Sequence, residues 1–155
     1  MRILVIFGKE RNINMATKIK PELSEKNKYW ISRHRYYELK HFCLQYPLWK
    51  KSYLIFEDYG LSKAPDITTA ISKSNAHGDP TGKCAEAKAF YRDRIDMVER
   101  VARMTDPLLE KYILKAVTEG YSYDYLKTRL EMPSVRDNYY EMYRRFFWIL
   151  DKVRG

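Results

Sequence analysis

The last third of the chain alternates apolar and polar residues at the spacing of an α-helix, beginning at Asp106. An aspartate followed by Pro107 is typical of a helix start, because proline fits the first helical position. Apolar residues then recur every three or four positions until Gly120, which is typical of a left-handed helix end. The pattern predicts a first helix over 107–119.

A short helix and a long one are predicted to follow. Ser122 is the expected N-cap of the short helix, and Pro133 helps to break that helix. Ser134 is the expected N-cap of the long helix, with Asp137 as the acidic residue of a capping box. A short helix, a break of a few residues and a capped helix are typical of a DNA-binding helix-turn-helix, here over 106–153.

The long helix has an apolar stripe and a polar face. The stripe is expected to pack on the two preceding helices and consists of Val135, Tyr139, Met142, Phe146, Ile149 and Val153. The polar face begins in the first turns, where a recognition helix meets base edges and phosphates. The residues expected to bind DNA are Ser134, Arg136, Asn138, Glu141, Arg144 and Arg145, together with Lys127 and Arg129 before them. A helical hairpin that binds no nucleic acid is the alternative interpretation.

Three consecutive aromatic residues lie near the end of this helix. A helix buries about half of its circumference, so three adjacent aromatic side chains cannot all face one core. Phe146 belongs to the stripe, and we therefore expect Phe147 and Trp148 to form an oligomer interface in a homodimer. In the alternative, the N-terminal helix folds back and covers both side chains in a monomer.

Aromatic and basic residues interleave between residues 28 and 58. Helical spacing predicts a hairpin of two helices there, the first ending near Gln45 and the second beginning at Pro47. Candidate accessory phosphate contacts on this hairpin are Arg33, Arg35, Lys40, Lys50 and Lys51. In the alternative, these cations form only the solvated face of amphipathic helices over an aromatic core.

Small and polar residues between 59 and 80 predict a linker. A long helix is then expected to begin at the Thr81 cap and to end at Met104, as part of a helical domain over 81–155. The outer face of that helix carries charges of both signs and is expected to be solvated. Residues 1–27 are predicted to form a disordered or weakly ordered lead. The predicted fold class is all-α, with an N-terminal helical hairpin, a linker, a long helix and a C-terminal helix-turn-helix.

The formal net charge of +9 is unevenly placed along the chain. Residues 1–56 carry 12 Lys and Arg against 4 Asp and Glu, whereas the remainder carries 17 against 16. Cations near phosphates supply the sequence-independent part of DNA affinity. The predicted helix-turn-helix therefore needs a basic neighbour or a partner. The positive charge also disfavours a DNA mimic, which would be acidic.

The sequence shows no phosphate-binding glycine loop, nucleophile elbow or zinc-protease motif. Candidate zinc ligands are His34, His41, Cys43, His77 and Cys84. On a helix, however, His41 and Cys43 point about 200° apart, and His34 and His41 lie about 10 Å apart along the axis. We expect no catalysis, no metal and no cofactor, and we expect both cysteines to be small buried apolar groups. No apolar run is long enough to span a membrane or serve as a targeting segment, so the expected location is the cytoplasm.

Three stretches carry a family resemblance, namely DPTGKCAEAKAFYRDRIDMVERVA, DPLLEKYILKAVTEGYSYDYL and SVRDNYYEMYRRFFWILDKVR. Over residues 79–153 the chain resembles phage and prophage regulators of the RinA and ArpU type, whose C-terminal half is similar to region 4 of sigma factors. The resemblance implies a transcriptional regulator of late phage genes. The chain departs from the sigma-like pattern at Asn138, where such units usually bury a small aliphatic residue, and Tyr139 follows it.

The predicted function is sequence-specific binding of double-stranded DNA to regulate phage late-gene transcription in the cytoplasm of a bacterial host. The expected partners are double-stranded DNA and a second copy of the chain, with host RNA polymerase as a further candidate and no membrane. Two alternatives stay open. One is a small terminase subunit, which packages DNA and assembles into rings, and the other is a phage inhibitor that binds a host defence protein.

Overall fold

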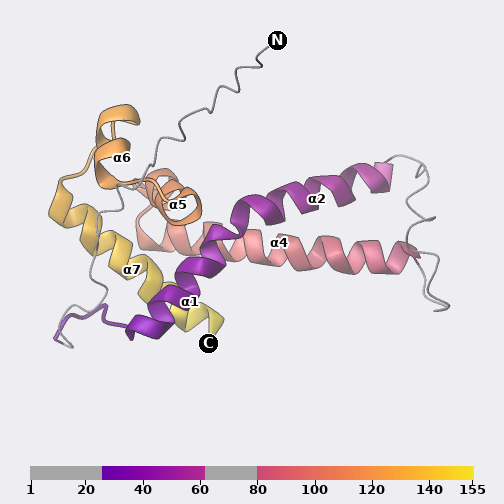
Figure 1. Ribbon diagram of the computed structural model, residues 1–155, viewed down its shortest axis with the longest axis horizontal. Helices are drawn as coiled ribbons and strands as arrows, with labels where there is room; N and C mark the ends of the chain where they lie inside the picture. Colours follow the sequence, from indigo (N-terminus) through magenta and orange to yellow (C-terminus); the bar gives the residue numbers. More distant parts are fainter. Residues whose placement is uncertain (1–25, 62–79) are drawn as a thin grey trace, which may run out of the picture.

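The computed structural model describes residues 26–61 and 80–155, and every regular element within these ranges is an α-helix. The all-α prediction is confirmed. The predicted lead over 1–27 and linker over 59–80 lie almost wholly outside the described residues. Figure 1 shows the helices α1 Arg33–Leu44, α2 Tyr46–Leu61, α4 Pro80–Thr105, α5 Glu110–Glu119, α6 Tyr123–Arg129 and α7 Arg136–Arg154.

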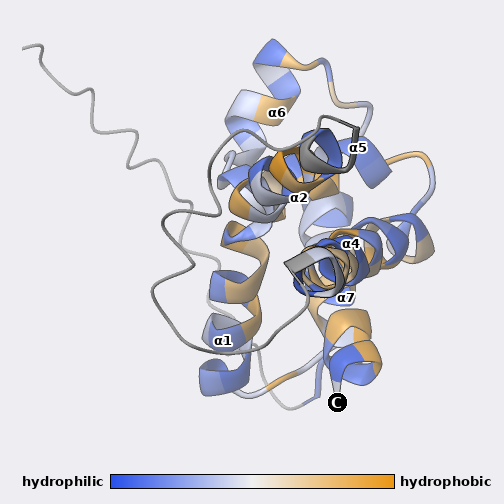
Figure 2. Cartoon of the chain, turned by 90° about the vertical axis from the view of Figure 1, so that its right-hand side faces the viewer, coloured by the Kyte–Doolittle hydropathy of each residue, from blue (hydrophilic) through white to orange (hydrophobic). Residues whose placement is uncertain are grey.

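The two N-terminal helices do not form the predicted hairpin. α1 follows Ser32, whose hydroxyl accepts a hydrogen bond from the Arg35 backbone N–H at 3.3 Å, and only Gln45 separates α1 from α2. Two antiparallel helices usually need a loop of about 2 to 5 residues. α2 therefore continues away from α1 and packs along α4 instead (Figure 1). Figure 2 looks along this pair, here called the arm and made of α2 with residues 80–99 of α4.

Polar contacts between α2 and α4 hold the arm together. Tyr46 donates a hydrogen bond to the Glu99 carboxylate, and the Lys50 amine lies 3.2 Å from the same carboxylate. Further along the arm, the Glu57 carboxylate lies 3.8 Å from the Lys88 amine. Lys88 and Glu99 belong to the face of α4 that was expected to be solvated. That expectation is wrong for these two residues, because α2 lies against this face.

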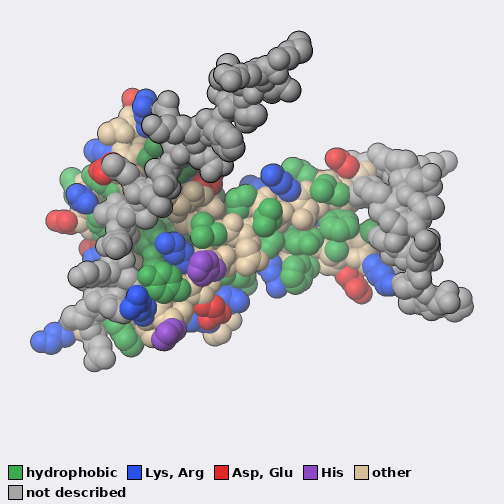
Figure 3. All heavy atoms as spheres, viewed as in Figure 1, with side chains coloured by type: hydrophobic (Ala, Val, Ile, Leu, Met, Phe, Trp, Pro, Cys, Tyr) green, Lys and Arg blue, Asp and Glu red, His purple; other side chains and the backbone are tan. Residues whose placement is uncertain are grey.

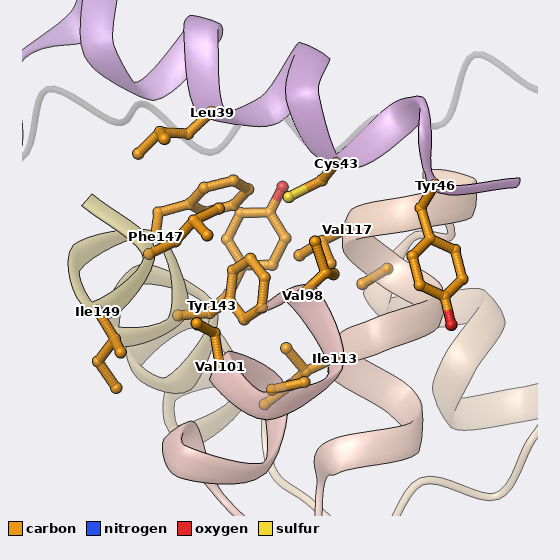
Figure 4. Packing of buried hydrophobic residues seen from close by; sticks show 14 of the residues in the cluster. Leu39, Cys43, Tyr46, Val98, Val101, Ile113, Val117, Tyr143, Phe147 and Ile149 are labelled. Carbon is orange, nitrogen blue, oxygen red and sulfur yellow. The ribbon is translucent and has the colours of Figure 1, made fainter. Parts of the chain in front are cut away.

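The core lies where α1, α4, α5 and α7 meet (Figure 4). Leu39 and Cys43 point from α1 toward Tyr143 and Phe147 on α7, while Val98 enters from α4. Leu39, Cys43 and Val98 have no exposed surface at all. Burial also raises the pKa of the Cys43 thiol well above its ordinary value. This is the environment predicted for Cys43.

α4 extends one residue beyond its predicted bounds at each end. Its C-terminal half supplies buried Ile95, Val98 and Ala102 to the core. Cys84, in contrast, is exposed, because the first turns of α4 lie in the arm and away from the core. The prediction of a buried Cys84 is wrong. None of the described helices is long and apolar enough to cross a membrane.

Candidate functional site

Two of the predicted helix signals act as expected, Gly120 at the end of α5 and Ser122 at the start of α6, whereas α5 begins three residues later than the predicted 107. Asp106 accepts hydrogen bonds through Oδ1 from the backbone N–H groups of Leu108 and Leu109, at 2.8 and 3.3 Å, and α5 becomes regular at Glu110. Gly120 ends α5 in the left-handed conformation with a φ of 74°. The Ser122 hydroxyl accepts a hydrogen bond from the backbone N–H of Tyr125 at 3.2 Å and so caps α6.

Side chains of α6 bind the backbone of the break between α6 and α7, residues 130–135. The Lys127 amine donates hydrogen bonds to the backbone carbonyls of Met132 and Ser134, at 3.1 and 3.2 Å. The Tyr123 hydroxyl donates to the same Ser134 carbonyl at 3.2 Å. The side chain of Met132 is buried, and its backbone N–H donates to the Leu126 carbonyl at 3.1 Å. Lys127, predicted to bind DNA, is therefore engaged with the backbone of the break.

Ser134 does not form the predicted capping box. Its side chain is buried, and its hydroxyl oxygen accepts a hydrogen bond from the Asn138 amide at 3.0 Å. Val135 takes the N-cap position of α7 without any side-chain cap. Ser134, also predicted to contact DNA, is therefore buried at the end of the break, where Tyr123 and Lys127 bind its backbone carbonyl.

The buried face of α7 is wider than the predicted stripe. Tyr139, Phe146 and Ile149 are buried as expected, whereas Val135 is 69% exposed. The face also includes buried residues outside the predicted stripe, namely Tyr143, Phe147 and Leu150. α7 packs against α1 as well as against α4 and α5, so partners surround more of its circumference than two preceding helices could cover. The burial of Tyr139, next to exposed Asn138, settles which of the two faces the core.

Phe147 lies inside the monomer rather than in an oligomer interface. It is 1% exposed, and its ring centroid lies 5.0 Å from that of Tyr36 on α1 and 5.1 Å from that of Tyr143. Trp148 is half-buried, with its ring centroid 5.9 Å from that of Tyr29. The prediction for Phe147 is wrong, because α1 covers its ring within the chain, whereas the predicted interface role of Trp148 stays a prediction.

Two of the accessory phosphate contacts are already engaged in ion pairs. The Arg35 guanidinium lies 2.6 Å from Asp151 and 2.9 Å from Glu38, and its hydrogen bond lowers the pKa of the Glu38 carboxyl. Lys50 pairs with Glu99 on α4. The Arg35–Asp151 pair joins α1 to α7 and the Lys50–Glu99 pair joins α2 to α4, so these two cations stabilise the fold. Of the remaining three, Arg33 and Lys51 are exposed and Lys40 is half-exposed.

The first turns of α7 carry the exposed part of the predicted DNA surface. Arg136 is exposed, with its guanidinium carbon 6.0 Å from the ring centroid of Tyr123 and 5.7 Å from that of Tyr140. One helical turn past Tyr140, Arg144 is half-buried, and its Nε is a buried atom without a hydrogen-bond partner. Glu141, beside it, pairs with Lys28 at 2.7 Å.

The predicted DNA surface has two further cations, one on α6 and one on α7. Arg129, at the end of α6, is exposed, and Arg145 on α7 is half-exposed. Neither is drawn into the break in the way that Lys127 is. Arg129, Arg136, Arg144 and Arg145 are thus the predicted DNA-binding cations that keep an exposed or half-exposed position.

Within the described ranges, no three His, Cys, Asp or Glu side chains come together as a metal site would require. His34 and His41 are exposed on α1, Cys43 is buried, and His77 lies outside the described residues. Comparisons with known proteins assign no family, because no family model, curated protein or solved structure matches the chain.

Proposed function

We propose that the protein binds double-stranded DNA through the first turns of α7, and that it regulates transcription of phage genes in this way. α6, the break over 130–135 and α7 would form the helix-turn-helix, with α7 as the recognition helix in the major groove. Base contacts would come from Arg136 on α7, with Arg129, Arg144 and Arg145 as phosphate contacts.

The observation that carries this proposal is the contrast between the two ends of α7. The far end is enclosed by other helices, with Phe146, Phe147 and Leu150 all 1% exposed or less. At the near end, Val135 is 69% exposed and Arg136, Asp137 and Asn138 are also exposed. Figure 1 shows α6 and the start of α7 at the side of the molecule opposite the arm. A helix anchored at one end and exposed at the other can enter a groove without loss of core packing.

The N-terminus of α7 also suits a phosphate group. Val135 provides no side-chain cap, so the backbone N–H groups of the first turn are not engaged by a capping side chain. The helix dipole places partial positive charge at this end, and N–H groups at helix starts are common phosphate ligands in protein–DNA complexes. Arg136 lies in the same turn. An exposed helix start beside an arginine is therefore chemically suited to an anionic backbone.

Electrostatics limit how strongly this surface alone can bind. The chain after residue 56 has nearly balanced charge, and Arg35 and Lys50 are engaged in ion pairs within the fold. Affinity through α7 should then depend on a few phosphate contacts and fall with salt. We therefore expect base contacts to supply a larger share of the DNA affinity than they would in a protein with a broad basic surface.

Fluorescence anisotropy with a labelled duplex pool of random sequence tests this proposal. The protein should bind the pool, and the logarithm of its affinity should fall linearly with the logarithm of salt concentration. Arg144→Ala should weaken binding and reduce that slope by about 1, as expected for the loss of one phosphate contact. Arg92→Ala is the matched control, because Arg92 lies exposed on the arm, where it pairs with Asp96 at 3.6 Å.

The opposite results would remove the proposal. If the wild-type protein fails to bind the pool at low salt, or if Arg92→Ala lowers affinity as much as Arg144→Ala, α7 is not the DNA surface. Circular dichroism of each variant excludes loss of fold as the cause.

A further inference from the structure

α2 exposes a stripe of apolar residues on the side that faces away from α4. Leu48 is 61% exposed, Leu54 57% and Ile55 51%, which are high values for side chains of this size. Figure 3 shows hydrophobic side chains along this part of the arm. Together with Lys51 and Asp58, which are also exposed, these residues form what we call the outer stripe. At 100° per residue the outer stripe covers about one third of the helix circumference.

The opposite face of α2 is already occupied by α4. Trp49 is 5% exposed, and Phe56 stacks on Tyr91 with ring centroids 6.0 Å apart. Tyr53 packs against the core with the Lys88 amine 5.3 Å from its ring centroid. The outer stripe is therefore not needed to hold α2 in place, and its exposure needs a different explanation.

Charged residues on α2 divide between these two faces. Lys50 and Glu57 pair with Glu99 and Lys88 on α4. Lys51 and Asp58, each one residue further along, lie on the outer stripe and form no ion pair with another described residue. They are seven positions apart, or about 10 Å along the axis, with Leu54 and Ile55 midway between them.

We propose that the outer stripe is the surface on which a second copy of this chain docks, with the two α2 helices antiparallel. A two-fold axis that passes between Leu54 and Ile55 would place Lys51 of each copy against Asp58 of the other. The apolar pair lies at the centre and two ion pairs lie at the flanks, as a self-complementary interface requires.

The charge pattern selects this arrangement over others. In a parallel pair, Lys51 of one copy would face Lys51 of the other, and the two Asp58 side chains would also face each other. Both like-charge contacts are unfavourable. A foreign partner would need its own matching cation and anion at the same spacing, whereas a second copy provides both. The interface is closed by its two-fold symmetry, so the structure points to a dimer and not to a ring.

Multi-angle light scattering in the absence of DNA tests this inference independently of the proposed function. The wild-type protein should approach twice the chain mass of 18.7 kDa as its concentration rises through the micromolar range. Ile55→Glu should keep the mass at 18.7 kDa at every concentration. Leu108→Glu is the matched control, because Leu108 is 83% exposed and lies outside the arm, and this variant should dimerise like the wild type.

A charge exchange then tests the antiparallel geometry. Lys51→Asp places two carboxylates together at both flanks and should weaken dimerisation on the order of tenfold. The double variant Lys51→Asp with Asp58→Lys exchanges the signs on both copies and should restore the wild-type dimerisation constant. In a parallel interface Lys51→Asp would only replace one like-charge pair with another, so the single variant would dimerise about as well as the wild type.

Several outcomes would overturn the inference. They are a wild-type chain that stays monomeric at high micromolar concentration, a dimer that survives Ile55→Glu, a ring of higher mass, or a double variant that dimerises no better than Lys51→Asp. Because no DNA is present, none of these results bears on the role of α7.

Discussion

Replacement of Phe147 by alanine tests the packing of α7 against α1. The side chain is 1% exposed, and its ring centroid lies 5.0 Å from Tyr36, 5.1 Å from Tyr143 and 5.2 Å from Phe146. A buried phenylalanine replaced by alanine usually costs about 3 to 5 kcal/mol, because transfer free energy is lost and a cavity remains. The edge-to-face contacts with these three rings favour the upper part of that range.

Chemical denaturation of Phe147→Ala should therefore show a large drop in the free energy of unfolding. Proteins of this size are commonly stable by about 5 to 15 kcal/mol, so the variant should stay folded but with a clearly lower midpoint. Phe90→Ala is the control of the same residue type. Phe90 is 47% exposed, and its loss should cost about 1 kcal/mol or less.

The same variant separates a core position from a subunit interface. If Phe147 belongs to the monomer core, Phe147→Ala should lower the free energy of unfolding by the same amount in the wild-type chain and in the Ile55→Glu chain. Distant sites contribute additively to stability. A loss below about 1 kcal/mol would refute the packing described here, given the usual cost of such a cavity. A loss that appears only as a change in molecular mass would return Phe147 to a subunit interface.

The remaining predictions concern an ion pair, two backbone positions and alkaline pH. Asp151→Asn should lower the free energy of unfolding by about 1 to 2 kcal/mol in chemical denaturation, because Arg35 lies 2.6 Å from Asp151 and both side chains are mostly buried. Gly120→Ala should cost about 1 kcal/mol, because a φ of 74° is unfavourable for any side chain, and Glu131→Gly, at a φ of 53°, should instead raise stability slightly or leave it unchanged. Burial raises the pKa of Tyr46 from 10.0 to about 12. The folded state thus favours the neutral phenol. Its contribution to the free energy of unfolding is complete below pH 10 and is lost between pH 10 and about 12. Tyrosinate absorbance and circular dichroism followed together should show the buried phenols ionising only as helix is lost.

Local signals in the sequence located the end of α5 and the start of α6, whereas α5 and α7 begin later than predicted. Ser122 and Gly120 act through backbone geometry within one turn of their own position, so their roles follow from residue type alone. The capping box at Ser134 could not be judged in the same way. Its outcome depends on Tyr123 and Lys127, which bind the Ser134 carbonyl from another helix.

The sequence predictions that are wrong concern residues whose environment depends on contacts between helices. The three consecutive aromatic residues 146–148 predict that at least one of them packs outside the α7 stripe. The sequence does not determine whether α1 or a second chain packs against it. Likewise, Arg35 and Lys50 are cations in an amphipathic pattern, and only the fold brings Asp151 and Glu99 to them. The outer stripe does not follow from the sequence pattern either, because residues on both faces of α2 are apolar and the position of α4 decides which face is covered.

Selection of bound duplexes from a random pool, followed by sequencing, tests the role of α7 most directly. The wild-type protein should enrich a short sequence motif, and Arg136→Ala should lose about 1 to 3 kcal/mol of affinity for it if Arg136 reads guanine. The same variant should bind a scrambled duplex with nearly wild-type affinity, and Arg92→Ala should enrich the wild-type motif. No enriched motif, or a motif that Arg136→Ala enriches equally well, would contradict α7 as the recognition helix.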